Sequence, residues 1–206
     1  MELPPARDAG PETTGRQDNQ PEMHEQEREQ NPRIYVASLA DYNNGILHGT
    51  WIDATQDTSA LHADIVAMLA NSPTGNAEEF AVHDYEGFGQ YRVGEYDSLD
   101  LLSRIAYGIH EHGPAFAAWA SHCAYDRDAL DRFEDAYLGD WANVVAYADD
   151  LLESLGLRDI IDRHVPDVFQ PYVQLDVEAF ARDLELGGDI TAIDHADGVW
   201  IFDGTV

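Results

Sequence analysis

The first apolar segments of the chain have the length and composition of β-strands. Residues 34–39 (Ile-Tyr-Val-Ala-Ser-Leu) and 46–53 lie on either side of Asp41-Tyr42-Asn43-Asn44-Gly45. Because Asn and Gly tolerate the backbone conformations of tight turns, these two segments are predicted to pair as a strand and its returning strand. Phe80 to Tyr85 predicts a third strand.

The following segments repeat their apolar residues at the spacing of amphipathic helices. One of them lies between the second and third strands, so the first part of the chain is predicted to be a small α/β unit. Thr58 or Ser59 is expected to cap one helix and Ser98 a second. Further helices are predicted to begin at Pro114, at Asp126 or Asp128, and at Asp140. The last has the clearest stripe, which consists of Trp141, Val144, Val145, Ala148, Leu151, Leu152 and Leu155. Gly156 is expected to end it.

The C-terminal part combines helix and hairpin patterns. Pro166 and Pro171 interrupt a short helical stretch. Asp176 is expected to cap a further helix, which stops at Gly187-Gly188. Residues 190–193 and 199–202 predict a hairpin. The whole pattern predicts an α+β fold: a small α/β sheet unit, a central helical bundle, and C-terminal helices with a β-hairpin.

Residues 1–32 differ in composition from the rest. Five prolines, many Glu and Gln and few apolar residues predict a disordered extension. The whole chain has 40 acidic residues, 11 arginines and no lysine, with a formal net charge of -29. The extension accounts for 8 acids and 3 arginines, which leaves 32 acids and 8 arginines in residues 33–206. The negative charge therefore belongs mainly to the part that is predicted to fold.

A folded surface of this charge limits the partners. It repels the phosphates of nucleic acids and of anionic lipids, so direct binding to nucleic acid or to a membrane is not expected. It attracts basic grooves, including those that hold DNA. Duplex DNA has about one charge per 1.7 Å of axis, so 32 carboxylates correspond to an upper limit of about 54 Å.

Other features of the sequence bear on disulfide-linked, metal-binding, membrane, secreted and cofactor-binding proteins. Cys123 is the only cysteine, so neither an internal disulfide nor a cysteine zinc cluster is expected. No apolar run approaches the length of about 18 residues that a membrane span needs, and the N-terminus lacks the apolar core of a signal peptide. A cytoplasmic location is therefore expected. There is no glycine-rich phosphate loop, and neither a cofactor nor a metal is expected.

Three residue groups offer catalytic or metal-binding chemistry, and each also has a structural interpretation. His83-Asp84 could form the catalytic pair of a hydrolase, but neighbours in a strand point to opposite faces. His110-Glu111-His112 could bind a metal, but His residues at i and i+2 do not share a helix face, so this segment is expected to end a helix. Arg182-Asp183 is expected to form an ion pair or an interface contact.

Helix spacing arranges many of the acids in rows. On a helix that starts at Asp126 or Asp128, Asp131 and Asp135 line one face, and Leu130, Phe133 and Tyr137 line another. Further acids lie off the apolar stripe of the next helix and continue beyond it. The acids expected to imitate DNA phosphates are Asp126, Asp128, Asp131, Asp135, Asp140, Asp149, Asp150, Glu153, Asp159, Asp162, Asp167 and Asp176.

Three blocks of the sequence resemble the ArdA family of antirestriction proteins. The first block runs from Ile34 through Tyr42-Asn43-Asn44-Gly45 to Gly49-Thr50-Trp51. The second is Glu79-Phe80-Ala81-Val82-His83-Asp84-Tyr85-Glu86, and the third is Tyr172 to Asp183, followed by the Gly-Asp-Ile hairpin start. Their order and spacing agree with the family over about residues 33–203. The extension 1–32 departs from the family pattern.

The resemblance implies a fold and a function. It implies an elongated chain of three small subdomains, here 33–96, 97–139 and 140–206, with a homodimer formed through the C-terminal region. It implies a non-catalytic DNA mimic whose partner is a Type I restriction–modification enzyme, bound at the DNA-binding core of specificity and methyltransferase subunits. An alternative is a general acidic module that sequesters another basic DNA-binding or regulatory protein.

Overall fold

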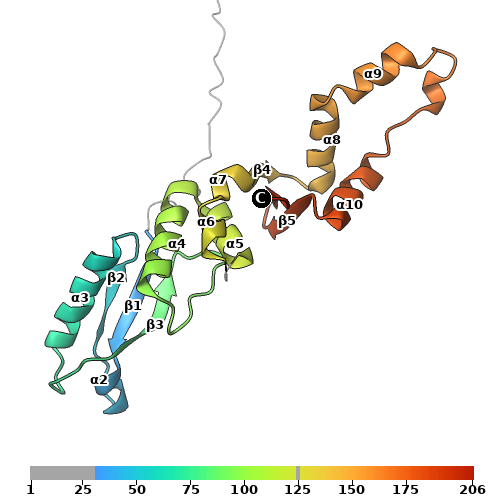
Figure 1. Cartoon of the computed structure of the whole chain (residues 1–206). Coiled ribbons are helices and arrows are strands. Elements are labelled where there is room, and N and C mark those ends of the chain that lie inside the picture. The colour runs from blue at the N-terminus through green and yellow to red at the C-terminus, as the bar shows by residue number, and fades with distance from the viewer. Residues whose placement is uncertain (1–30, 124–125) are drawn as a thin grey trace, which may run out of the picture. The chain divides into compact units, whose positions relative to one another are not determined.

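The computed structural model describes residues 31–123 and 126–206, which fold as one unit from Asn31 to Val206. The predicted extension lies outside the described residues except for Asn31 and Pro32. These two already contact the folded part: the Asn31 side chain donates to Asp53 at 2.8 Å, and the Pro32 carbonyl accepts from Ala54. Helices and two small antiparallel sheets confirm the predicted α+β class (Figure 1).

The first sheet has the strand order β2-β1-β3 and is antiparallel throughout. It consists of β1 (Arg33–Ser38), β2 (Gly49–Asp53) and β3 (Phe80–Glu86), as the sequence predicts apart from a later start of β2. Helix α3 (Thr58–Ala70) packs against β1 and β2 (Figure 1). Its cap is Asp57 and not the predicted Thr58 or Ser59, because the Asp57 carboxylate accepts from two backbone N–H groups of the first turn.

A short helix, α2 (Leu39–Asn43), replaces most of the turn that was predicted between β1 and β2. The Ser38 hydroxyl caps it by accepting from the backbone N–H of Asp41. The chain then leaves α2 by two backbone hydrogen bonds to the Asp41 carbonyl, from Asn44 and Ile46. Because the backbone N–H of Ile46 bonds to α2, this residue cannot pair with β1, and the returning strand β2 starts only at Gly49.

Asp41 is fully buried, which is unusual for a carboxylate. The hydroxyls of Ser72 and Thr74 and the Thr74 backbone N–H donate to it from the loop after α3. Burial on its own would raise the pKa of Asp41, but the hydrogen bonds from Ser72, Thr74 and Ser38 outweigh burial and hold the pKa well below its usual value. The carboxylate therefore fastens the loop before β3 to α2.

The central helices follow the predictions closely. Helix α4 (Leu99–His112) is capped by Ser98, and α5 (Pro114–His122) begins at its proline. The two helices pack against each other, and Gly108 of α4 makes the contact close, because a Cβ at this position would overlap the ring of Phe116. The predicted helix end at 110–112 is confirmed, since Gly113 adopts a φ of 75°.

The prediction is wrong for the next segment, where one helix was expected from Asp126 or Asp128 and another from Asp140. Two short helices, α6 (Arg127–Leu130) and α7 (Phe133–Ala136), are followed by a strand, β4 (Tyr137–Trp141), and only then by α8 (Val144–Ser154). Helix α8 therefore begins at Val144 and not at Asp140. Pairing of β4 with a C-terminal strand overrides the helical spacing, and the φ of 118° at Gly139 is incompatible with a helix.

The second sheet has the order β4-β6-β5, with the predicted hairpin formed by β5 (Ile190–His195) and β6 (Gly198–Asp203). Its central strand buries both faces. Val199 and Ile201 pack with residues of α8, β4 and α10 (Val177–Gly187), whereas Trp200 and Phe202 join the aromatic core formed with α5 and α7. The Phe202 ring lies 5.0 Å from that of Trp119.

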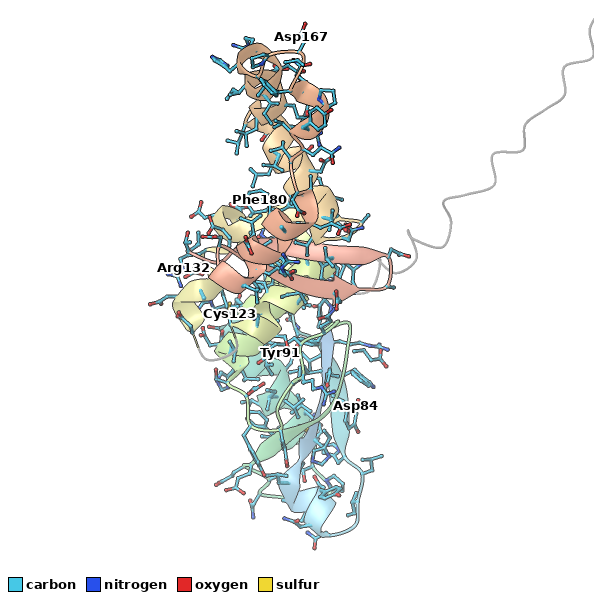
Figure 2. All side chains as sticks on the ribbon, turned by 90° about the vertical axis from the view of Figure 1, so that its right-hand side faces the viewer. Asp84, Tyr91, Cys123, Arg132, Asp167 and Phe180 are labelled. Carbon is cyan, nitrogen blue, oxygen red and sulfur yellow. The ribbon has the colours of Figure 1, made fainter. Side chains whose placement is uncertain are left out.

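Between α8 and α10, residues 155–173 form an excursion that adds almost nothing to the hydrophobic core. It contains α9 (Leu157–His164) and a 3-10 turn, η1 (Gln170–Tyr172), neither of which has a buried residue. The Gln170 side chain ties the two together by donating to the carbonyls of Asp162 and Val165. Asp167 lies at the tip of this excursion (Figure 2).

Candidate functional site

The surface of the folded part is dominated by carboxylates. Of its 32 acidic residues, all but Asp41, Asp97 and Asp203 are exposed. All twelve acids expected to imitate phosphates are among the exposed ones. The structure brings them onto α6 to α9, β4 and the caps and loops between these elements and α10.

The acids around α6 and α7 are not arranged as the sequence predicted. Since the expected helix is broken, Asp128, Asp131 and Asp135 do not form one row along a single helix. Asp126 is the cap of α6 and accepts from the backbone N–H of Asp128 at 3.0 Å. It also lies 3.4 Å from Arg132, which lies at the surface (Figure 2). Asp131 pairs with Arg104 of α4 at 2.7 Å.

The acids of α8 do lie off its apolar face, as predicted. Asp149, Asp150 and Glu153 are exposed, whereas Ala148 and Leu152 are buried. Arg158 of α9 binds two of these acids: it pairs with Asp149, and its Nε lies 3.2 Å from Glu153. The arginine therefore joins α8 to α9 and offsets part of their negative charge.

Asp140 is held differently. Its carboxylate accepts from Nε2 of His195 at 2.9 Å, and the His195 ring is stacked on Trp200 with centroids 4.4 Å apart. Asp176 caps α10 by accepting from the backbone N–H of Ala179. These contacts fix carboxylates to strands and helix ends, so their positions depend on the fold and not on a mobile stem.

The arginine and histidine pairs divide the twelve acids into two groups. Five are paired: Asp126, Asp131, Asp140, Asp149 and Glu153. Among the side chains that the structure describes, which do not include that of Arg127, the other seven take part in no such pair: Asp128, Asp135, Asp150, Asp159, Asp162, Asp167 and Asp176. The sequence alone could not assign these pairs, because Arg104 and Arg158 lie on other helices than the acids with which they pair.

The candidate catalytic pair His83-Asp84 lies on β3, and both residues are exposed. The His83 ring meets Tyr42 edge-on at 4.8 Å, and the Asp84 carboxylate accepts from the backbone N–H of Tyr85. Burial, followed by the charge of Asp126, raises the pKa of the Cys123 thiol, and Arg132 opposes only part of this shift.

The metal-binding candidates at the end of α4 are also held apart. His110 lies 4.0 Å from Glu111, whereas His112 lies 4.0 Å from Glu134 and is stacked against Phe116. Within the described ranges, no three His, Cys, Asp or Glu side chains are grouped so that they could hold a metal ion. No helix in the same ranges is long and apolar enough to cross a membrane.

The fold and this surface define the class of protein: an acidic α+β chain that presents carboxylates on short helices and their caps. The family model described as antirestriction protein (ArdA) matches residues 34–197. The chain therefore belongs to the ArdA family of antirestriction proteins, and the resemblance seen in its sequence is confirmed. A comparison with curated proteins found no match. Family membership implies an antirestriction function and an interaction with restriction enzymes.

Proposed function

We propose that the chain inhibits Type I restriction–modification enzymes by occupying their DNA-binding core in place of DNA. The observation that carries this proposal is the exposure of all twelve candidate acids on ordered elements. A basic groove that neutralises phosphates gains the same Coulomb energy from carboxylates held at a similar spacing. The bound chain would block restriction of incoming DNA, and also its modification if both activities use the same groove.

The unpaired acids are the strongest candidates for phosphate substitutes. A carboxylate beside an arginine has part of its charge already offset, so it attracts a partner less at a distance. The seven acids without such a pair continue from α6 and α7 through α8 and α9 to the cap of α10. This places charge on short rigid elements, which a disordered acidic segment cannot do.

Inhibition by occupancy needs neither a cofactor nor a catalytic residue. We therefore propose that the chain is not an enzyme and acts in the cytoplasm, where restriction enzymes meet incoming DNA. The contacts of the exposed His83 and Asp84 support this view, because His83 meets a tyrosine ring and Asp84 accepts from a backbone N–H. A His83→Ala variant that retains full inhibition supports the non-catalytic account, and loss of inhibition by a stably folded variant contradicts it.

We further propose that two copies associate through the excursion between α8 and α10. Large apolar side chains are exposed there: Leu155, Val168, Phe169, Tyr172 and Val173. Residues 155–173 contain three aspartates and two arginines, so this segment is close to neutral in a strongly negative chain. Association through these apolar side chains would remove them from water.

The solution mass tests this association. Light scattering is expected to give about twice the chain mass of 22.9 kDa, and Phe169→Asp is expected to restore the single-chain mass. Val66→Asp is the matched control, since Val66 is 62% exposed on α3, outside the excursion. A single-chain mass for the unaltered protein, or equal effects of both variants, contradicts the proposal.

A restriction assay tests the proposed function itself. In cells that have a Type I system, unmodified phage DNA should survive when the chain is produced. In the same cells without the chain, the DNA should be cut. If survival is unchanged although the chain is folded and abundant, the Type I target is wrong. Recovery of other basic proteins from a lysate, without restriction subunits, would instead favour the general acidic module.

A further inference from the structure

The acidic surface contains one hollow that charge alone does not explain. A cavity of about 250 Å³ lies between α4, α5, α6 and α7. Binding sites for drug-sized molecules have volumes of about 300–1,000 Å³, so this hollow suits a smaller group such as one side chain. Its lining combines buried apolar residues with two exposed carboxylates and with Arg104, which pairs with one of them.

The floor of the hollow is apolar and rigid. Phe116, Leu130 and Phe133 line it and are each at most 6% exposed. Gly108 also lines it, and the missing side chain at this position lets the Phe116 ring approach α4. Glycine in the interior of a helix is about 1 kcal/mol less favourable than alanine. Gly108 therefore destabilises α4 slightly, but it allows the close contact with the Phe116 ring.

Aromatic rings form the sides. The ring of His112 lies 5.7 Å from Phe116 in a stacked arrangement and 4.9 Å from Phe133. Tyr107 also lines the hollow and is 55% exposed. Such rings attract a cation that lies over their faces, with guanidinium groups favoured over ammonium groups.

Two carboxylates stand at the edge. The side chains of Asp131 and Glu134 are 75% and 81% exposed. Asp131 already pairs with Arg104, which shows that a guanidinium fits beside this edge. Among the described side chains, Glu134 forms no arginine pair, and its carboxylate lies 4.0 Å from Nε2 of His112.

We propose that this hollow receives one arginine side chain of the bound enzyme, an inference that rests on the proposed function. The apolar stem of the arginine would cover the floor, its guanidinium would stack beside Tyr107 and His112, and Glu134 would accept its hydrogen bonds. A nucleic-acid phosphate is disfavoured there, because Glu134 repels it and the charge of Arg104 is already offset by Asp131. The hollow would thus bind the enzyme at one defined point, whereas the rest of the surface attracts the enzyme by its summed charge.

A pair of neighbouring substitutions separates the anchor from general charge. Glu134→Gln and Asp135→Asn each remove one exposed carboxylate from α7, but only Glu134 lines the hollow. In competition with DNA for a Type I methyltransferase core, Glu134→Gln should weaken inhibition about tenfold or more, and Asp135→Asn only by the about 1.4- to 5-fold expected of an exposed charge. Equal effects of the two variants overturn the proposal.

A second pair leaves the formal charge unchanged. Tyr107→Ala should weaken inhibition about fivefold, whereas Tyr96→Ala, which removes a 78% exposed ring elsewhere, should have no effect. Thermal unfolding of each variant checks that the fold is kept. If folded Tyr107→Ala inhibits as well as the unaltered chain, the aromatic wall has no role and the proposal fails.

A direct probe keeps this inference separate from the proposed function. N-acetyl-arginine methylamide should produce saturable NMR shifts at the rings of Tyr107 and His112, and the isosteric uncharged citrulline derivative should not. Saturable binding with no inhibition of any Type I enzyme would refute the proposed function while keeping the arginine site. Equal shifts with both compounds, or none with either, would refute the site.

Discussion

Removal of the unpaired charge is the perturbation that the structure makes most informative. Asp150, Asp159, Asp162 and Asp167 are exposed, lie on α8, α9 and the following loop, and form no ion pair among the described side chains. Replacing all four by asparagine removes charge while keeping size and shape. Because exposed charges more than about 8 Å apart are largely screened at physiological salt, the four are expected to act almost independently, except for Asp159 and Asp162, which are neighbours on one face of α9.

The size of the effect follows from the usual strength of exposed ion pairs. One such pair contributes about 0.2–1 kcal/mol. At about 1.4 kcal/mol per tenfold, this is a loss of about 1.4- to 5-fold in affinity for each single substitution. At about 0.6 kcal/mol each, the middle of that range, four independent losses multiply to about 50-fold. The loss should be larger at low ionic strength, where screening is weaker.

The assay is displacement of labelled DNA from a Type I methyltransferase core, measured for the four single variants and for the quadruple variant. A quadruple Asp→Glu variant is the control, since it keeps the charge and moves each carboxylate by one methylene. The fold should not suffer, because removal of like charges relieves repulsion. One single substitution that abolishes inhibition without unfolding, or a quadruple asparagine variant that inhibits normally, would refute distributed charge mimicry.

Three further variants test separate parts of the structure. Arg158→Gln leaves two carboxylates of α8 without their cation, so inhibition should strengthen about 1.4- to 5-fold in the same displacement assay; weaker inhibition contradicts this. Gly108→Ala forces a methyl group against the Phe116 ring, so denaturant unfolding should show a net loss of up to about 2 kcal/mol despite better helix propensity; a gain contradicts it. Asp41→Asn should lower the unfolding midpoint at pH 7. The hydrogen bonds lower the pKa of Asp41 in the folded state, so its carboxylate stabilises the fold above about pH 4, and this stabilisation is lost as the pH falls further. The difference in unfolding midpoint between the two proteins should therefore shrink at about pH 3. A difference that stays constant contradicts this prediction.

Local signals were sufficient for the elements that have their own caps and turns. Ser98, Pro114 and Asp176 mark the starts of three helices, and the pattern at 190–202 marks a hairpin. These residues satisfy backbone groups within their own segment, so no knowledge of distant residues is required.

The failure at 126–143 has a physical cause that no local pattern contains. Trp141 and Val144 continue a helical stripe in sequence, yet Trp141 ends a strand that pairs with β6, about sixty residues away in sequence. Gly139 was the one local sign, because a glycine in a helix interior is unfavourable. Long-range pairing decided the structure of this segment.

The candidate surface shows the same division. Exposure of the acids follows from composition and from the apolar stripes. The identity of the paired acids does not, because Arg104 reaches Asp131 from another helix and His195 reaches Asp140 across the second sheet. The hollow beside Gly108 was equally hidden, since its lining comes together only when α4, α5, α6 and α7 pack.

Competition with DNA is the most direct test of the central claim. A Type I methyltransferase core is loaded with labelled DNA, and the unaltered chain is added at increasing concentration and at two salt concentrations. The account predicts complete displacement of DNA, less effective at high salt, with no binding of the chain to DNA alone. Retention of DNA by the core at saturating chain, or a stable complex that contains both, would contradict it.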